Sequence, residues 1–194
     1  MSDRNVRQYR YISAKMQARS EEAGPVIACY FALFNTPTEL FPGCIEQIAP
    51  GAFAESLTGD VRALIDHETR LVLGRTVAGT LTLREYEHGL YGEIKINEHD
   101  SDAMNLYARV LRGDVTQCSF GFDIIAEDYE VGADGQTCTW TIRKVILYEV
   151  SIVTFPAYEA TSAVARASDG NTTLKNIRLE RRKKELLERI KKNA

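Results

Sequence analysis

The sequence predicts a mainly β protein of the α+β class, with about six or seven strands in a closed or partly closed barrel. From Pro25 onward, short runs of β-forming residues alternate with turn residues, which is typical of all-β and α+β domains. Apolar residues at helical spacing follow Asp100, so at least one helix accompanies the strands. The chain has 194 residues, 44% of them hydrophobic, which is enough to bury one core.

The first half of the chain predicts three strands. Residues 26–34 (VIACYFALF) form a nearly continuous apolar run, which indicates a buried strand. The turn-rich residues 35–43 are expected to form a loop before a short strand at residues 45–48. A short helix is predicted at residues 52–57, and the alternating pattern of residues 61–67 (VRALIDH) predicts the third strand.

The middle of the chain predicts a hairpin and a helix. Residues 80–85 (TLTLRE) and 90–97 (LYGEIKIN) form two strands joined by a turn. A cap at Asp100 or at the next residue begins a helix that runs to Arg112, and Gly113 supplies its C-terminal stop. Apolar residues recur along this helix at helical spacing: Ala103, Leu106, Tyr107, Val110 and Leu111.

The remaining strands lie on both sides of an acidic segment. Residues 115–125 (VTQCSFGFDII) predict a strand, and the acidic, glycine-containing residues 127–135 are expected to form a loop. Residues 137–148 and 149–155 predict one or two further strands.

The chain is expected to have four parts. Residues 1–24, polar and without a clear period, predict a flexible N-terminal arm, and residues 25–166 form the main domain. The polar residues 167–173 are a linker, and residues 174–194 are a basic helical tail. The tail has nine basic and three acidic residues, a charge of +6, so the rest of this chain of net charge −3 carries −9.

Cysteines, histidines and hydropathy exclude several classes of protein. The N-terminal residues lack the apolar core of a signal peptide, and no apolar run reaches the roughly 18 residues of a membrane span, so a cytosolic protein is expected. In a reducing compartment the four widely spaced cysteines are expected to be buried thiols, not disulfides: Cys29, Cys44, Cys118 and Cys138. The three histidines share no ligand spacing, so no metal is expected.

Three polar residues in apolar surroundings have the chemistry of an activated serine. His67 ends one predicted strand, Ser119 lies between aromatic residues in another, and Glu149 lies within a third. An imidazole can take the proton of a serine hydroxyl while a carboxylate orients the ring. The residues alone also allow a plainer interpretation, in which His67 is a solvated rim residue and Ser119 a small packing residue.

Neighbouring residues offer alternative roles. Cys118 is a rival nucleophile, but side chains alternate along a strand, so Cys118 and Ser119 point to opposite faces and only one can meet His67. Ser151 shares a face with Glu149 and is a candidate to support it. Backbone N–H groups at Gly121 and in the turn near Gly113 are candidates for an oxyanion hole. The side chain of Arg112 could assist them, but its charge also suits the end of a helix. His88 and His99 are expected at the surface.

Six segments, in order, resemble the prohead proteases of tailed phages over residues 27–166. They are FALFNTPTELFPGCIEQIAPGAF, the DH pair ending in His67, LGRTVAGTLTL, HGLYGEIKI, RGDVTQCSFGFDI and LYEVSIVTFPAYEATSA. The resemblance implies a catalytic set of His67, Ser119 and Glu149, and a seven-stranded barrel surrounded by a few helices, distantly similar to herpesvirus assemblin. Assemblin-type enzymes use a second histidine where this chain offers Glu149. Gln47 replaces an arginine common in the pattern, without consequence for the catalytic set.

The resemblance implies a serine endopeptidase that cleaves the scaffolding segment of the phage major capsid protein, and itself, inside assembling proheads in the host cytoplasm. Residues 25–166 would then be the protease domain, and self-cleavage is expected near residues 166–173 or within residues 1–24. No cofactor and no membrane are expected, and a homodimer follows by analogy. The basic tail is expected to pair with a partner helix, and nucleic acid is not an expected partner. The alternative is a non-catalytic capsid-assembly or scaffolding module with the same fold.

Overall fold

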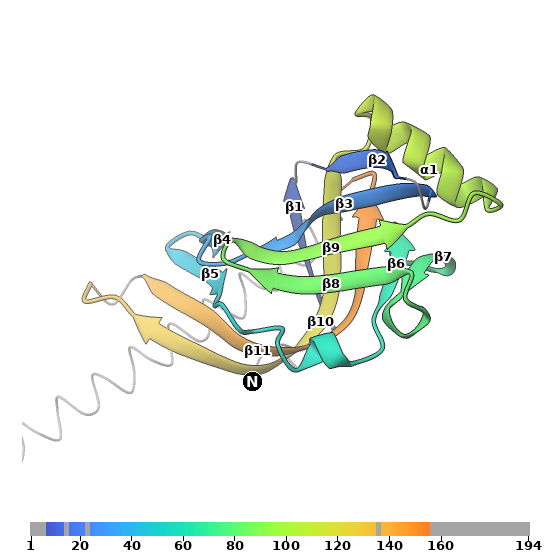
Figure 1. Cartoon of the computed structure of the whole chain (residues 1–194). Helices are drawn as coiled ribbons and strands as arrows, with labels where there is room; N and C mark the ends of the chain where they lie inside the picture. The colour runs from blue at the N-terminus through green and yellow to red at the C-terminus, as the bar shows by residue number, and fades with distance from the viewer. Residues whose placement is uncertain (1–6, 14–15, 22–23, 135–136, 156–194) are drawn as a thin grey trace, which may run out of the picture.

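The computed structural model describes residues 7–13, 16–21, 24–134 and 137–155. In these residues, eleven strands form a seven-stranded and a four-stranded sheet, with one α-helix beside them (Figure 1). The expected mainly β class is confirmed. The predicted linker at residues 167–173 and the basic tail at residues 174–194 lie outside the described residues.

The seven-stranded sheet has the order β1-β10-β11-β5-β4, with β6 paired to β11 and β7 paired to β6. Its strands are β1 (Gln8–Ser13), β4 (Thr38–Phe41), β5 (Cys44–Ile48), β6 (Arg62–Ile65), β7 (Glu68–Arg75), β10 (Gln117–Val131) and β11 (Cys138–Val153). The four-stranded sheet has the order β2-β3-β9-β8. Its strands are β2 (Gln17–Glu21), β3 (Gly24–Leu33), β8 (Leu81–Tyr86) and β9 (Gly89–Lys95).

One continuous core lies between the two sheets. β3 and β9 contribute fully buried side chains such as Ile27 and Ile94, and β10 and β11 contribute Phe120 and Ile152 from the other side. The apolar run that predicted β3 is buried along most of its length. Its two edges are paired with β2 and β9, and β1, β10 and α1 also contact the strand. Burial of large apolar side chains from both sheets therefore holds the two sheets together.

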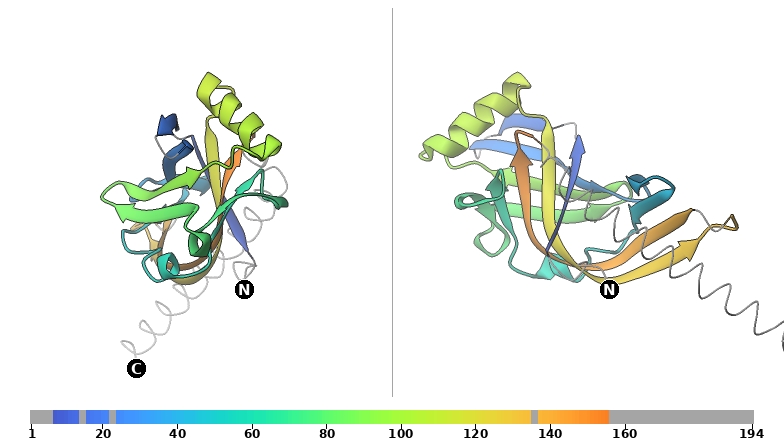
Figure 2. Two further views of the ribbon diagram at one scale, coloured as in Figure 1. Left: turned by 45° about the vertical axis from the view of Figure 1, so that its right-hand side comes forward. Right: turned by 180° about the vertical axis from the view of Figure 1, so that it is seen from behind.

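The β10–β11 hairpin is the longest unit of the fold, with strands of 15 and 16 residues. β5 lies parallel to its distal half, at Cys138–Ile142 of β11, and β6 lies parallel to its proximal half, at Glu149–Ile152. Register shifts after Gly121 and near Ala126 bend the ribbon, as the two views of Figure 2 show. The two halves of the hairpin therefore have different neighbouring strands.

The helix α1 (Ser101–Arg112) begins and ends as the sequence predicts. Asp100 is the N-cap, and its Oδ1 accepts hydrogen bonds from the backbone N–H groups of Asp102 (2.9 Å) and Ala103 (3.2 Å). Gly113 ends the helix in the left-handed conformation, with φ of 87°. The buried side of α1, which includes Leu106, joins the core.

The prediction of a flexible arm at residues 1–24 is wrong for the residues that form β1 and β2. β1 pairs with β10, and β2 pairs with β3. The polar composition concealed β1 because its charged residue is paired inside the protein. Arg10 is buried and forms a two-pronged ion pair with Glu46 of β5, which includes a 2.9 Å bond from Nη2 to Oε2. A partner so distant in sequence gives no local signal.

Four other boundaries differ from the predictions. β4 lies within the loop expected at residues 35–43, and β10 continues to Val131 through much of the expected acidic loop. The short helix predicted at residues 52–57 is a turn followed by a 3-10 helix at Ser56–Thr58. β7 was not predicted, because this strand pairs only with β6 and its exposed residues are largely polar. Cross-strand pairing overrides local composition in each new strand.

The prediction that all four cysteines are free thiols is also wrong. Cys44 and Cys138 form a disulfide, although 94 residues separate them in the sequence. The parallel pairing of β5 with β11 places the two residues directly opposite each other, with Cα atoms 4.6 Å apart. Cys29 and Cys118 are free and buried, as expected. Sequence spacing could not identify the pair because it depends on the register of two distant strands.

Candidate active site

His67 lies in the two-residue turn between β6 and β7, not at the end of a strand as predicted. Asp66 and His67 both have positive φ, of 48° and 63°. Positive φ at both central residues is the requirement of a tight hairpin turn that matches the twist of its strands. Neither residue is glycine, so the turn stores conformational strain that the surrounding contacts must offset.

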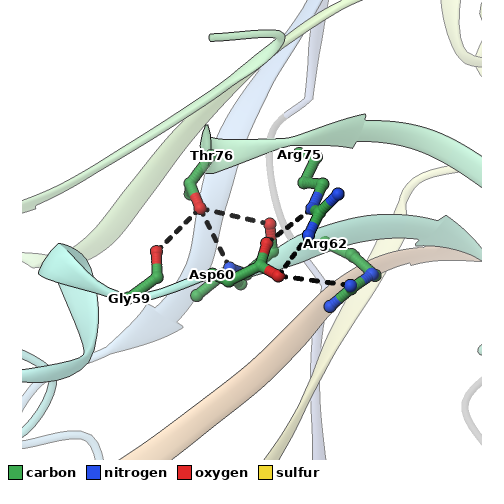
Figure 3. A network of polar contacts seen from close by, with 6 residues as sticks. Gly59, Asp60, Arg62, Arg75 and Thr76 are labelled. Atoms are coloured by element: carbon green, nitrogen blue, oxygen red, sulfur yellow. Dashed lines mark hydrogen bonds and ion pairs between the residues drawn. The ribbon is translucent and has the colours of Figure 1, made fainter. Parts of the chain in front are cut away.

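A polar network closes the other end of this hairpin, next to β6 and β7 (Figure 3). Asp60 accepts two hydrogen bonds from Arg75, at 2.7 and 2.6 Å, and one from Arg62 at 3.2 Å. The hydrogen bond from Arg75 is the main reason that the pKa of Asp60 is lowered. Thr76 donates its hydroxyl proton to the carbonyl of Gly59 at 2.8 Å. The hairpin that presents His67 is therefore fixed at its base.

Asp66 attaches the turn to the end of β11. Its Oδ1 accepts a hydrogen bond from the backbone N–H of Thr154 at 2.7 Å, and its Oδ2 accepts one from the Thr154 hydroxyl at 3.2 Å. The Asp66 backbone N–H donates to the carbonyl of Ile152 at 3.0 Å. The position of the neighbouring His67 is thus fixed relative to β11, the strand that carries Glu149.

Glu149 connects His67 to the sheet. Its Oε1 lies 2.7 Å from His67 Nδ1, and its Oε2 accepts a 2.5 Å hydrogen bond from the hydroxyl of Ser151. Glu149 is buried, so both oxygens find their partners inside the protein. Gly121 is its partner on β10, and a Cβ built on Gly121 would lie 2.5 Å from Glu149 Oε1. The absence of a side chain at Gly121 leaves room for the carboxylate.

Ser119 lies on β10, opposite Ser151 of β11 and opposite Tyr11 of β1. Side chains of paired residues share one face of a sheet, here the face opposite to the main core. The His67 ring packs edge-on against Tyr9, with centroids 4.6 Å apart, and against Tyr11 at 6.0 Å. Because Tyr9 pairs with Gly121 and Tyr11 with Ser119, the ring lies against β1, on the face of the sheet that carries Ser119.

Two polar atoms of this cluster are buried without a hydrogen-bond partner among the described residues. They are Nε2 of His67 and Oγ of Ser119. The two atoms form no hydrogen bond with each other in this structure, and an unpaired imidazole nitrogen and an unpaired hydroxyl are available for proton transfer. The imidazole has its other nitrogen on a buried carboxylate, which is the arrangement of a base that activates a hydroxyl for acyl transfer.

Cys118 lies on the other face of β10, as strand alternation predicts. It is fully buried, and its Sγ lies 3.1 Å from the carbonyl oxygen of Tyr30. Its neighbour Cys29 has a pKa raised well above the ordinary value, first by a hydrogen bond with Cys118 and then by burial. Cys118 therefore faces the core and not His67, which favours Ser119 over Cys118 as the partner of His67.

The weaker candidates lie elsewhere. Arg112 is exposed and pairs with Asp114, with Nε 2.7 Å from Oδ2. The backbone N–H of Gly113 donates to Val110 at the end of α1, so this amide is not free to bind an oxyanion. His88 packs near the ring of Tyr30, away from the site. Sequence reasoning did not identify the two tyrosines of β1 that flank His67, because β1 was taken as part of an arm.

No group of three or more histidine, cysteine or acidic side chains in the described residues could hold a metal ion. Within the same residues, no helix is long and apolar enough to cross a membrane.

Comparison with known proteins places the chain in a family. The sequence model of the caudovirus prohead serine proteases matches residues 13–176. The prohead protease of Enterobacteria phage HK97 is 33% identical over 137 residues, which cover 67% of this chain and 57% of that protein. The chain therefore spans less than two thirds of that relative. The structure of the bacteriophage T4 capsid assembly protease matches with a TM-score of 0.46 and 10% identity, over 78% of this chain and all of that one. Because the family model covers most of its length, this chain belongs to the caudovirus prohead serine protease family.

Proposed function

We propose that this protein is a serine endopeptidase that cleaves the scaffolding segment of the phage major capsid protein, and itself, during prohead maturation. Ser119 is the nucleophile, His67 its base, and Glu149 the residue that orients His67. The observation that carries the proposal is the 2.7 Å contact between His67 Nδ1 and Glu149, which leaves the buried Nε2 of the same ring unpaired, as is the Ser119 hydroxyl.

The reaction follows from these positions. His67 Nε2 accepts the proton of Ser119 as Oγ attacks the peptide carbonyl, and then gives that proton to the departing amine. A bond from Oγ to the carbonyl carbon forms, the peptide C–N bond breaks, and water later hydrolyses the acyl-enzyme by the same route. Glu149 accepts a hydrogen bond from the protonated Nδ1 of His67 and stabilises the imidazolium that forms transiently.

The partners and place of action come from the family. The HK97 relative is named a prohead protease, so the proposed substrate is a capsid or scaffolding protein within the assembling prohead of the infected host cell. Self-cleavage is proposed near residues 166–173 or within residues 1–24 outside β1 and β2, because small and polar residues are typical of the segments that proteases cut. A homodimer and a partner helix for the basic tail stay predictions.

Co-expression with the cognate major capsid protein tests this proposal, with cleavage products measured by intact mass. Wild type and Cys118→Ala are expected to trim the capsid protein, and Ser119→Ala is expected to lose detectable trimming. Cys118→Ala is the matched control, because it alters the adjacent residue on the core face. Trimming by Ser119→Ala would contradict the assigned nucleophile. Assembly of shells without trimming by any of the three chains would favour the non-catalytic scaffolding module.

A further inference from the structure

Ser151 is a buried residue of the site with no part in the proton transfers described above. Its side chain is fully buried on β11, directly opposite Ser119. Its hydroxyl donates to Glu149 Oε2 at 2.5 Å, while Glu149 Oε1 contacts His67. Each oxygen of the carboxylate therefore has one partner, and the two partners lie on different segments of the fold.

A glutamate in this role needs a second contact more than an aspartate would. Glu149 has one more rotatable bond than aspartate, and the terminal torsion of a glutamate is broad. A single hydrogen bond to His67 leaves the carboxylate free to turn about that torsion. The Ser151 hydroxyl restrains this rotation, because residues two apart on a strand share a face. On the opposite strand, the missing side chain of Gly121 leaves room for the carboxylate but provides no hydrogen bond.

We infer that Ser151 is a positioning residue, which acts on catalysis through Glu149 by holding its carboxylate in the orientation that His67 requires. This inference rests on the proposed function for its catalytic consequence. The Ser151 hydroxyl supplies the hydrogen bond that Glu149 Oε2 accepts inside the protein. A serine that only fills space would not affect the orientation of Glu149.

The kinetic test compares Ser151→Ala and Ser151→Cys with wild type in cleavage of the capsid protein. The cysteine variant keeps nearly the same volume but is a weak donor, so it separates hydrogen bonding from packing. In both variants kcat is expected to fall about 10- to 100-fold with KM unchanged, since the lost contact supports the reaction and not substrate binding. Wild-type kcat in Ser151→Cys would overturn the inference.

Ser56→Ala is the matched control. The Ser56 hydroxyl also bonds to β11, donating to the Val145 carbonyl at 2.8 Å and accepting from the Leu147 N–H at 3.0 Å. It makes no contact with Glu149, so this variant is expected to lose stability without a change in kcat. An equal fall in kcat in Ser56→Ala would mean that loss of any hydroxyl along β11 is sufficient, and would contradict the specific role of Ser151.

A second readout does not depend on activity. The proton shared by His67 Nδ1 and Glu149 is observed by nuclear magnetic resonance in Ser119→Ala, with and without Ser151→Cys. Its signal is expected to shift when the Ser151 hydroxyl is lost, because the carboxylate is then free to turn away from Nδ1. An unchanged signal would overturn the inference. If the signal shifts but wild type cleaves nothing, the proposed function fails and the contact stands.

Discussion

The two ends of the β10–β11 hairpin are built from the same pair of strands but have opposite chemistry. At the proximal end, β1 and β6 flank the hairpin, and the face away from the core carries Ser119, Glu149 and buried polar atoms without partners. At the distal end, β5 takes the place of β6, and the Cys44–Cys138 disulfide lies beside a small aromatic cluster that includes Trp140 and Tyr129. One buried polar atom without a partner, the Tyr129 hydroxyl, also lies at this end. Figure 2 shows the bend that separates the two ends.

The comparison indicates that the proximal end of the hairpin carries the candidate site, while the distal end stabilises the fold. Unpaired buried polar groups destabilise a fold, and so do non-glycine residues with positive φ such as His67. A disulfide that closes a long loop stabilises it, in the chain-entropy account by restricting the unfolded chain. The distal end can thus offset the cost of the proximal end, and changes to each end should affect different properties.

The largest expected effect is that of Gly121→Ala at the proximal end. The added Cβ would lie 2.5 Å from Glu149 Oε1 and 3.0 Å from Tyr9 Cε1, so the carboxylate must move away from His67. A displacement of about 1 Å in a catalytic group can cost roughly 100-fold in rate, so kcat is expected to fall by about that factor. Steady-state cleavage of the capsid protein measures it.

Gly51→Ala is the control for this glycine change. Gly51 has φ of 86° and open space around its Cβ position, so alanine there adds backbone strain of about 1 kcal/mol without a clash. Its unfolding free energy should fall while kcat stays at the wild-type value. Equal kcat in the two alanine variants would show that the Glu149 carboxylate tolerates a side chain at Gly121.

A smaller effect is expected from Asp66→Ala, which removes both side-chain bonds to Thr154. The turn loses its attachment to β11, and alanine is less tolerant of positive φ than aspartate. We expect kcat to fall about tenfold and stability by about 1–2 kcal/mol. Asp66→Asn keeps an acceptor and tolerates the left-handed conformation, so it should stay near wild type. Equal losses in both variants would point to the charge of Asp66 instead.

The smallest effect on catalysis is expected from the double variant Cys44→Ala with Cys138→Ala at the distal end. Loss of the disulfide should lower the unfolding free energy by about 2–4 kcal/mol, measured by denaturant titration. Its kcat at a temperature where the protein is folded should equal that of wild type. A large fall in kcat would show that the two ends of the hairpin are coupled, and would contradict the claim that changes to each end affect different properties.

Part of the site could be predicted from local pattern. Strand alternation correctly separated Cys118 from Ser119, because the period of two is a property of the strand itself. The strand predicted at residues 61–67 ends earlier, at Ile65. Asp66 and His67 form a turn, where alternation does not apply. The turn was missed because its residues are neither glycine nor asparagine.

The sequence by itself determined the mainly β class, the caps of α1 and the apolar runs of the core strands, since these depend on propensity and contacts close along the chain. Only the tertiary structure decided which cysteines pair and where β1 lies. It also decided that His67 contacts Glu149, which is 82 positions away in the sequence. These features depend on the register between distant strands, which local composition does not specify. The polar residues that looked like an arm or a loop are satisfied by partners that only the folded chain brings near.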